Sequence, residues 1–365
     1  MLKSDKISCL DLKGQHQQVK KEIFEAFEKV YEKTAFSGGP FVQEFEEKFS
    51  KYVGSKHAIG VGNGTVSLHL AMLALDIGPG DEVIIPANTF IATAWGVSHA
   101  GAKPVFCDIN LDDLNIDVDE LENKITSKTK AILFTNVYGF LCNYDKLNNI
   151  AKKHGLYLIE DAAESFGAKY NGKMSGTLGD ISTFSFFGNK TITTGEGGMI
   201  LCKKKFHYEK IIKLKNQGNT NKTYFHDVLG YNYRMTNIQA AIGLGQLNKI
   251  DEIISLKKEL YNNYKNHLNK KVRFLKNLDN TVPSYWMTPI IFDEIEKKQK
   301  IEQELMLKNI ATRPFFTPID NLPFYKESDC ESAKKIFEFG LLLPSYPGLS
   351  NDDQGGICKI INSII

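Results

Sequence analysis

The sequence predicts an α/β fold built on a mostly parallel sheet, followed by a smaller α+β domain. One observation is that short β-branched runs alternate with helical stretches through the middle of the chain. This rhythm is typical of strand–helix–strand units whose strands run parallel. The other observation is a change of character after about residue 235, where short strand-like pieces mix with longer helices. We therefore expect a large α/β/α domain and a second, smaller domain.

The repeating units can be located in the middle of the chain. The predicted elements are a strand at 81–86 (DEVIIP), a helix at 89–100, a strand at 103–108 (KPVFCD), a strand at 131–135 (AILFT), a helix at 144–154 and a strand at 156–159 (LYLI). Ligands of such sheets gather at the carboxyl ends of the strands, so candidate site residues are sought there.

The second domain is expected after a helical run, TNIQAAIGLGQLNKIDEIISLKKEL, with apolar residues at helical spacing. The pieces VRFL and YWMTPIIF then predict strands, and residues 294–309 predict a helix. We predict a large domain at 1–245, which includes an N-terminal arm, and a small α+β domain at 246–365.

Composition narrows the class of protein. The 365 residues carry a formal net charge of +2, which gives no global field for binding nucleic acid or an anionic membrane. No stretch approaches the roughly 18 apolar residues of a membrane-spanning helix. The six cysteines lack the spacing of a metal site, so we expect no metal and reduced thiols in the cytoplasm.

An acidic pair, Glu160 and Asp161, lies where an apolar strand ends (LIED), followed by AAESFG. A carboxylate at the mouth of a parallel sheet can bind a metal, act as a base or hold a protonated ring nitrogen. The alternative is that Asp161 only caps the next helix. These residues alone leave the choice open.

A lone lysine, Lys190, lies in SFFGNKTITTGEGG between an apolar strand and a Gly/Thr-rich loop. Such a lysine is usually an ordinary surface residue. In a partly dry site, however, a lysine loses its proton readily enough to form a Schiff base. Only one strand separates Lys190 from Asp161, so both could reach the same edge of the sheet.

A glycine-rich turn, GVGNGT, runs directly into the helical pattern VSLHLAML, which we expect to be amphipathic. Free amides at the start of a helix suit a phosphate group. The same letters also make an ordinary turn and N-cap, so this motif is weak by itself.

Taken in order, the motifs GNGT, PANTF, EDAA, SFFGNK with TTGEGGM, and GYNYRMTNIQAAIG resemble those of the DegT/DnrJ-type sugar aminotransferases. The resemblance runs from about residue 11 to residue 347. It implies the aspartate aminotransferase-like fold (fold type I) of pyridoxal 5'-phosphate (PLP) enzymes. It also implies a homodimer whose active sites lie at the subunit interface.

The resemblance assigns a role to each motif. Lys190 would hold PLP as a Schiff base and move the proton, and Asp161 would pair with the pyridine nitrogen. Glu164 would lie near the phenolic oxygen, where relatives often carry Gln or His. The remaining cofactor-binding residues it implies are Gly64, Thr65 and Ser185 at the phosphate, Phe90 and Ala163 on the two ring faces, and Asn232 reaching the phosphate from the partner subunit.

Within that family, SFFGNKTITTGEGGM, NYRMTN and TRPFFTPIDNLPFY most resemble the GDP-perosamine synthases. These use glutamate, which becomes 2-oxoglutarate, to aminate C4 of GDP-4-keto-6-deoxymannose for bacterial surface polysaccharide, including lipopolysaccharide O-antigen. Asn136 and Asp320 depart from the pattern, because many relatives carry histidines there near the sugar nucleotide. The resemblance leaves the roles of these two residues and of Arg313 open.

Three alternatives remain beside that substrate. One is amination of another dTDP- or UDP-linked 4-keto or 3-keto sugar. Another is a PLP-dependent sugar dehydratase, against which Lys190 argues because those relatives replace this lysine by histidine. The third is a non-catalytic regulatory relative, which has no need of Lys190, Asp161 and Ser185 together.

Overall fold

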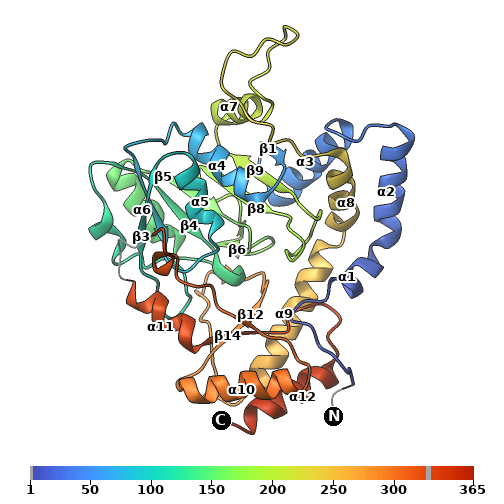
Figure 1. The fold of residues 1–365 in the computed structure, drawn as a ribbon, viewed down its shortest axis with the longest axis vertical. Coiled ribbons are helices and arrows are strands. Elements are labelled where there is room, and N and C mark those ends of the chain that lie inside the picture. Colours follow the sequence, from blue (N-terminus) through green and yellow to red (C-terminus); the bar gives the residue numbers. More distant parts are fainter. Residues whose placement is uncertain (1–2, 326–329) are drawn as a thin grey trace.

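A seven-stranded sheet forms the centre of the larger part of the molecule in this computed structural model, which describes residues 3–325 and 330–365 (Figure 1). Its strands, in spatial order, are β1 (Ala58–Val61), β9 (Gly198–Cys202), β8 (Ile181–Ser185), β5 (Tyr157–Asp161), β4 (Thr129–Thr135), β2 (Glu82–Pro86) and β3 (Lys103–Cys107). From β8 to β3 the neighbours are parallel, and β9 is antiparallel to both β1 and β8. The predicted α/β class with a mostly parallel sheet is confirmed.

Helices cover both faces of this sheet. On one face, Ala131 and Leu133 of β4 share a core with α4 (Gly64–Ala74), α5 (Ala92–His99) and α7 (Lys205–Lys215). On the other face, Ile132 and Phe134 pack with α6 (Tyr144–His154). Successive side chains of a strand point to opposite faces, so the buried run AILFT supplies both cores.

Two predicted helices differ from the structure. The helix predicted at 89–100 begins only at Ala92, and residues 89 and 90 line a cavity instead. The expectation that α4 is amphipathic is wrong, because seven of its eleven residues are buried. It is covered by the sheet, by α5 and by α7, so no side of it is left to be polar.

Four helices pack beside β1 and β9. They are α1 (Leu12–Gln18), α2 (Lys20–Glu32), α3 (Pro40–Val53) and α8 (Asn237–Leu247). The single helical run predicted after residue 235 is in fact two helices, α8 and α9 (Ile250–His267). At the end of α8, the side chain of Gln246 bonds both the N–H and the carbonyl oxygen of Thr193, which ties α8 to the loop after Lys190.

The C-terminal part is built on an antiparallel sheet in the order β10 (Arg273–Phe274), β12 (Thr288–Ile291), β14 (Gly340–Leu343) and β13 (Arg313–Pro314). Its helices are α10 (Ile295–Leu307), α11 (Glu331–Phe339) and α12 (Asn351–Asn362), and short 3-10 helices occur at η1 (Leu121–Lys124), η2 (Val137–Gly139) and η3 (Ile319–Asn321). Figure 1 shows α9 running from the upper layer down to this sheet. The domain boundary at 245/246 stays a prediction.

Two contacts tie the parts of the chain together. A small sheet pairs β11 (Thr281–Val282) with β6 (Lys169–Tyr170), which in turn pairs with β7 (Lys173–Met174). Near the N-terminus, Ile7 forms a parallel bridge with Ile310 and is buried in the C-terminal core. Within the part of the chain that the structure describes, no helix is both long and apolar enough to cross a membrane.

The close packing of α5 on α4 generates a stability prediction. A Cβ at Gly96 would lie 2.5 Å from Leu68 Cβ, so we expect Gly96→Ala to lower the free energy of unfolding by about 1–3 kcal/mol. The control is Gly355→Ala in α12, where an added Cβ meets nothing within 4 Å and should stabilise by about 0.5–1 kcal/mol. Urea unfolding measures both, and equal stability of Gly96→Ala and wild type would contradict the predicted clash.

Candidate active site

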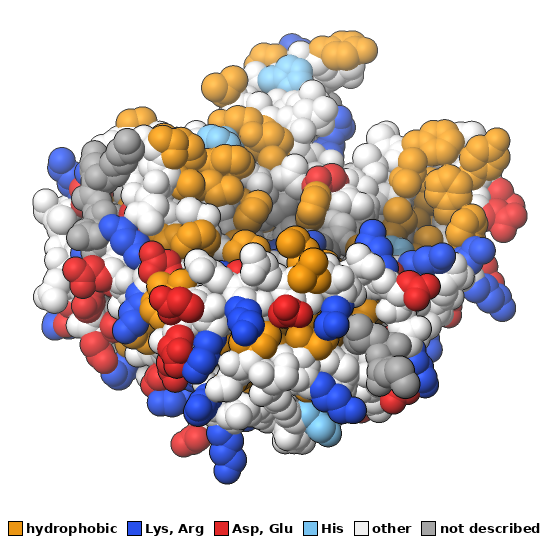
Figure 2. Space-filling model, turned by 60° about the horizontal axis from the view of Figure 1, so that its bottom comes forward, with side chains coloured by type: hydrophobic (Ala, Val, Ile, Leu, Met, Phe, Trp, Pro, Cys, Tyr) orange, Lys and Arg blue, Asp and Glu red, His pale blue; other side chains and the backbone are white. Residues whose placement is uncertain are grey.

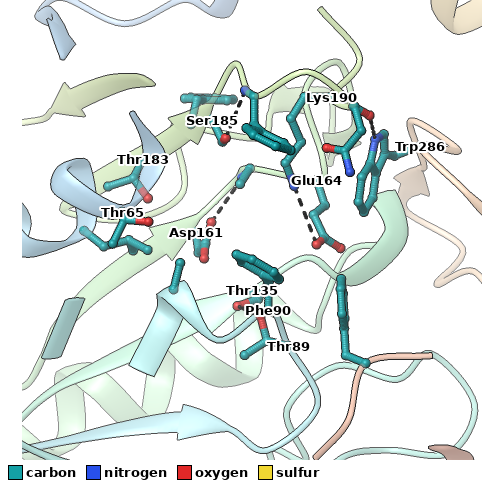
Figure 3. Close-up of a pocket in the computed structure, with 18 of the residues that line it drawn as sticks. Thr65, Thr89, Phe90, Thr135, Asp161, Glu164, Thr183, Ser185, Lys190 and Trp286 are labelled. Carbon is teal, nitrogen blue, oxygen red and sulfur yellow. Dashed lines mark hydrogen bonds and ion pairs between the residues drawn. The ribbon is translucent and has the colours of Figure 1, made fainter. Parts of the chain in front are cut away.

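A cavity of about 440 Å³ opens at the carboxyl ends of β4, β5 and β8 (Figure 3). The N-terminus of α4, the segment around Lys190 and residues from the C-terminal part also line it. It is therefore where a parallel sheet is expected to hold a ligand. The structure brings together here Gly64, Thr65, Phe90, Asp161, Ala163, Glu164, Ser185 and Lys190.

Asp161 faces the cavity and its neighbour Glu160 does not. Alternation along β5 sends Glu160 to the opposite face of the sheet, where Ser175, Ser182 and the N–H of Leu178 donate to it. Asp161 Oδ2 accepts a 2.8 Å bond from Thr93 Oγ1, and Oδ1 accepts from the N–H of Ala163 at 3.1 Å. Turns rather than a helix follow β5, so the helix-cap alternative for Asp161 is wrong.

The Asp161 carboxyl is poised for a cationic partner. Burial raises its pKa, against the opposing effects of the Thr93 and Ala163 hydrogen bonds and the Lys190 charge. A buried carboxylate gains stabilisation from a nearby N–H⁺ group, because the low dielectric strengthens their attraction. It can therefore hold a ligand nitrogen in its protonated form.

Lys190 is buried among groups that control its charge. Its Nζ lies 3.8 Å from Glu164 Oε1 and 4.2 Å from the centre of the Trp286 ring, and Figure 3 shows Lys190 and Glu164 pointing toward each other. Burial lowers the pKa of Lys190, while the charges of Glu164 and Asp161 act in the opposite direction. A lysine with a lowered pKa supplies the neutral amine that Schiff-base formation needs.

Glu164 is fixed by the backbone on the far side of the cavity. Its Oε2 accepts a 2.8 Å hydrogen bond from the N–H of Tyr138, which has a left-handed φ of 55°. Burial raises the pKa of Glu164 to about 7, and Lys190 and Tyr138 oppose that shift. Near neutral pH this carboxyl can therefore either hold or release a proton.

The N-terminus of α4 forms an anion site next to Ser185. Asn63 caps the helix through Oδ1, which accepts from the N–H of Val66 at 3.0 Å. The first N–H groups of a helix have no intrahelical acceptor, so those of Gly64 and Thr65 are free for a ligand. A Cβ at Gly64 would lie 2.8 Å from Ser185 Cβ, so only glycine allows this close approach.

These residues fit PLP by the chemistry of their donors. An anion site for its phosphate, a buried carboxylate for its ring nitrogen and a buried lysine for its aldehyde line one cavity. Phe90 and Ala163 line the same cavity and supply apolar surface for the ring. The cofactor roles of these residues are taken up below as proposals.

Asn232 does not line this cavity. It is exposed, forms an isolated bridge with Asn216 and accepts a 3.2 Å bond from Arg234 Nε. It lies at the return of the segment between α7 and α8, which projects from the body of the molecule (Figure 1). Its role in a partner's site stays a prediction.

Asn136 and Asp320 lie away from the cavity, so the expectation that they sit near the sugar nucleotide is wrong for this chain. Asn136 is fully buried, donates to Glu160 Oε1 at 3.1 Å, and accepts from the N–H of Cys142 at 3.2 Å. Asp320 is also buried and accepts from the N–H of Cys330. Neither is among the residues that line the cavity.

Three residues that position the site were missed in the sequence. Thr93 holds Asp161, Tyr138 holds Glu164, and Trp286 packs on Lys190 while its Nε1 donates to Asn189 O at 2.9 Å. Thr93 could have been suspected, since it lies four residues after Thr89 and the two hydroxyls are 3.0 Å apart. Trp286 comes from the C-terminal part and has no local signal.

Comparison with known proteins gives a consistent result. Residues 17–362 match the model of the DegT/DnrJ/EryC1/StrS aminotransferase family. The GDP-perosamine synthase of Escherichia coli O157:H7 is 45% identical over 89% of this chain and 90% of its own length, and that of Vibrio cholerae is 43% identical over 90% and 91%. The PLP form of Spr1654 from Streptococcus pneumoniae superposes with a TM-score of 0.89 at 27% identity, covering 95% of each chain.

The raised pKa of Glu164 generates a pH prediction for the cofactor-free protein. Between its ordinary pKa of 4.5 and about 7, the folded chain keeps a proton that the unfolded chain loses. Its contribution to the free energy of unfolding should therefore fall as pH rises through this window, by at most about 1.4 kcal/mol per pH unit, and level off above it. Glu164→Gln removes this titration. Urea unfolding of both proteins between about pH 5 and 8 should show a converging difference; parallel profiles would contradict the buried, protonated carboxyl.

Proposed function

The chain belongs to the DegT/DnrJ/EryC1/StrS aminotransferase family, and from that membership we propose that it makes GDP-perosamine. It is a PLP-dependent aminotransferase. In the proposed reaction the amino group of glutamate replaces the C4 keto oxygen of GDP-4-keto-6-deoxymannose, and glutamate leaves as 2-oxoglutarate. Two relatives named GDP-perosamine synthase, at 45% and 43% identity, support this substrate.

The observation that carries the proposal is the meeting of Lys190 and Asp161 in one buried cavity. PLP bound there supplies an electron sink for the electrons released when a proton leaves the amino donor. We assign Asp161 to the ring nitrogen, because a carboxylate held by Thr93 and Ala163 favours the protonated nitrogen. Asp161 therefore orients the cofactor and maintains its charge.

Lys190 is assigned to anchoring and proton transfer. Its lowered pKa makes the Nζ a base at neutral pH, and Glu164 at 3.8 Å can share the proton that Nζ takes up. Trp286 covers Lys190 on one side and excludes water from it. Glu164 would also face the phenolic oxygen, where its proton prevents two anionic oxygens from repelling each other.

The remaining cofactor contacts follow from the cavity lining. The Gly64 and Thr65 N–H groups and Ser185 Oγ are assigned to the phosphate, and Phe90 and Ala163 to the two ring faces. Each group lies on a helix end, a strand end or a tight turn, so little has to move when the ligand binds.

We also propose a homodimer that shares its active sites. Exposed aromatic side chains support it, notably Phe24 (62% exposed) and Tyr31 (65%) on α2, and Tyr224 (94%) on the projecting segment. Figure 2 shows hydrophobic side chains gathered on the side where Figure 1 places α2. Such a patch on a surface favours association. In that dimer Asn232 would reach the partner's phosphate site with its amide donors.

The proposed location is the cytoplasm. All six cysteines are free thiols and each is buried, which fits a reducing compartment. A near-neutral net charge of +2 also gives no support to nucleic acid or membrane partners.

A substrate panel tests the proposed function. The PLP-loaded protein and glutamate are incubated with GDP-, dTDP- and UDP-linked 4-keto and 3-keto sugars, and aminated products are detected by mass spectrometry. We expect the 4-amino product from GDP-4-keto-6-deoxymannose, and Lys190→Ala should retain PLP yet lose turnover by at least about a thousandfold. Preference for another nucleotide sugar would overturn the substrate, and near wild-type turnover in Lys190→Ala would overturn the site.

Subunit complementation tests the shared site. Lys190→Ala chains are mixed with Asn232→Phe chains, which we expect to be inactive because the bulky ring blocks the phosphate site. If the two residues serve one site across the interface, half of the sites in a mixed dimer carry neither lesion and activity reappears. A mixture of Lys190→Ala with Lys190→Met is the control and should stay inactive. No recovery after proven subunit exchange would contradict the shared site.

A further inference from the structure

The cavity has more anions to bind than the cofactor assignments account for, an argument that rests on the proposed function. Glutamate brings two carboxylates and the sugar nucleotide brings a diphosphate. The anion site at Gly64, Thr65 and Ser185 is taken by the cofactor phosphate, and Lys190 is taken by its aldehyde. Of the described residues that line the cavity, the one remaining cation is Arg313.

The use of arginine in this chain is selective. Of 45 basic residues only three are arginines, namely Arg234, Arg273 and Arg313. Arg273 donates to the carbonyl oxygen of Leu111 at 2.6 Å, and Arg234 donates to Asn232. The guanidinium of Arg313 has no hydrogen bond or ion pair within residues 3–325 and 330–365, and this residue is exposed. Arginine differs from lysine in offering a planar fork that fits two oxygens of a carboxylate or phosphate.

The local structure aims Arg313 into the cavity. Arg313 lies on β13, the edge strand of the C-terminal sheet, and pairs with Leu342 of β14, which also lines the cavity. Cross-strand partners share a face of the sheet, so both side chains point the same way. Pro314 follows directly, restricts Arg313 to an extended backbone and suits an edge strand, since it has no N–H to donate.

The rest of the lining makes the charge of Arg313 distinctive. Its neighbours in the cavity wall include Trp286, Met287 and Phe316, which offer no charge to a ligand. Asp161 and Glu164 on the other side are acidic and disfavour an anion. An anionic substrate group is therefore attracted toward the side of the cavity that the C-terminal sheet provides.

We propose that Arg313 is a substrate-binding residue whose guanidinium receives a pair of oxygens from an anionic group of the substrate. Two sources carry that chemistry, a carboxylate of glutamate in one half-reaction and the diphosphate of the sugar nucleotide in the other. Because both substrates use the same cavity in turn, one guanidinium can serve either or both. The cofactor contacts do not involve Arg313, so they remain intact without it.

The test measures the two sources separately in PLP-loaded protein. Titration calorimetry with GDP, and with dTDP and UDP, reports the diphosphate. The loss of PLP absorbance against glutamate concentration, without any sugar, reports the carboxylate. The variants are Arg313→Gln, which removes the charge, and Arg313→Lys, which keeps the charge and loses the fork. Arg273→Gln, outside the cavity, is the matched control, and PLP absorbance and thermal unfolding verify that each variant is folded and loaded.

We expect Arg313→Gln to weaken at least one of the two interactions by about 10- to 100-fold, Arg313→Lys by less, and Arg273→Gln by less than about twofold. A loss for nucleotide alone assigns the diphosphate, a loss for glutamate alone assigns the carboxylate, and a loss for both assigns both. If both interactions in Arg313→Gln stay within about twofold of wild type, the inference is overturned. Failure of the proposed function appears differently, as wild-type protein that binds no nucleoside diphosphate and aminates no keto sugar.

Discussion

The burial of the Asp161 carboxylate at the end of a parallel strand is the constraint on which the rest of the site depends. A buried charge needs hydrogen bonds and a cationic partner, or it becomes protonated. Thr93 and the N–H of Ala163 supply the hydrogen bonds, and Thr93 is placed by the packing of α5 on α4. The same packing sets the N-terminus of α4 beside Ser185. One arrangement of strand ends and helix ends thus fixes the carboxylate and the anion site together.

The opposite face of β5 supports this arrangement through Glu160. That carboxyl is fully buried and accepts from Ser175, Ser182, Asn136 and backbone N–H groups. Asn136 in turn accepts from the N–H of Cys142, which closes the loop that contains Tyr138. Tyr138 presents its N–H to Glu164, so the network behind the sheet holds a carboxyl inside the cavity. Two adjacent acids of one strand therefore do different work because the strand sends them to different faces.

Local signals in the sequence predicted the α/β class and brought the correct residues to one cavity. The strands at 81–86, 103–108, 131–135 and 156–159 could be recognised because buried parallel strands are short and continuously apolar. Trp286 could not be predicted, since its packing on Lys190 depends on how the C-terminal part folds back. Asn136 was misjudged because a position in a motif does not say which face a side chain takes. Its neighbour Thr135 lines the cavity, so strand alternation could have warned that Asn136 points away.

The most direct test of the account is the turnover of Asp161→Asn in protein that still carries PLP. The amide keeps the shape of the carboxylate and can still accept from Thr93 or Ala163, but it cannot stabilise a protonated ring nitrogen. The account predicts that PLP absorbance and thermal stability stay near wild type, while turnover with glutamate falls by at least about a hundredfold. Turnover within about threefold of wild type would contradict the central role of the buried carboxylate.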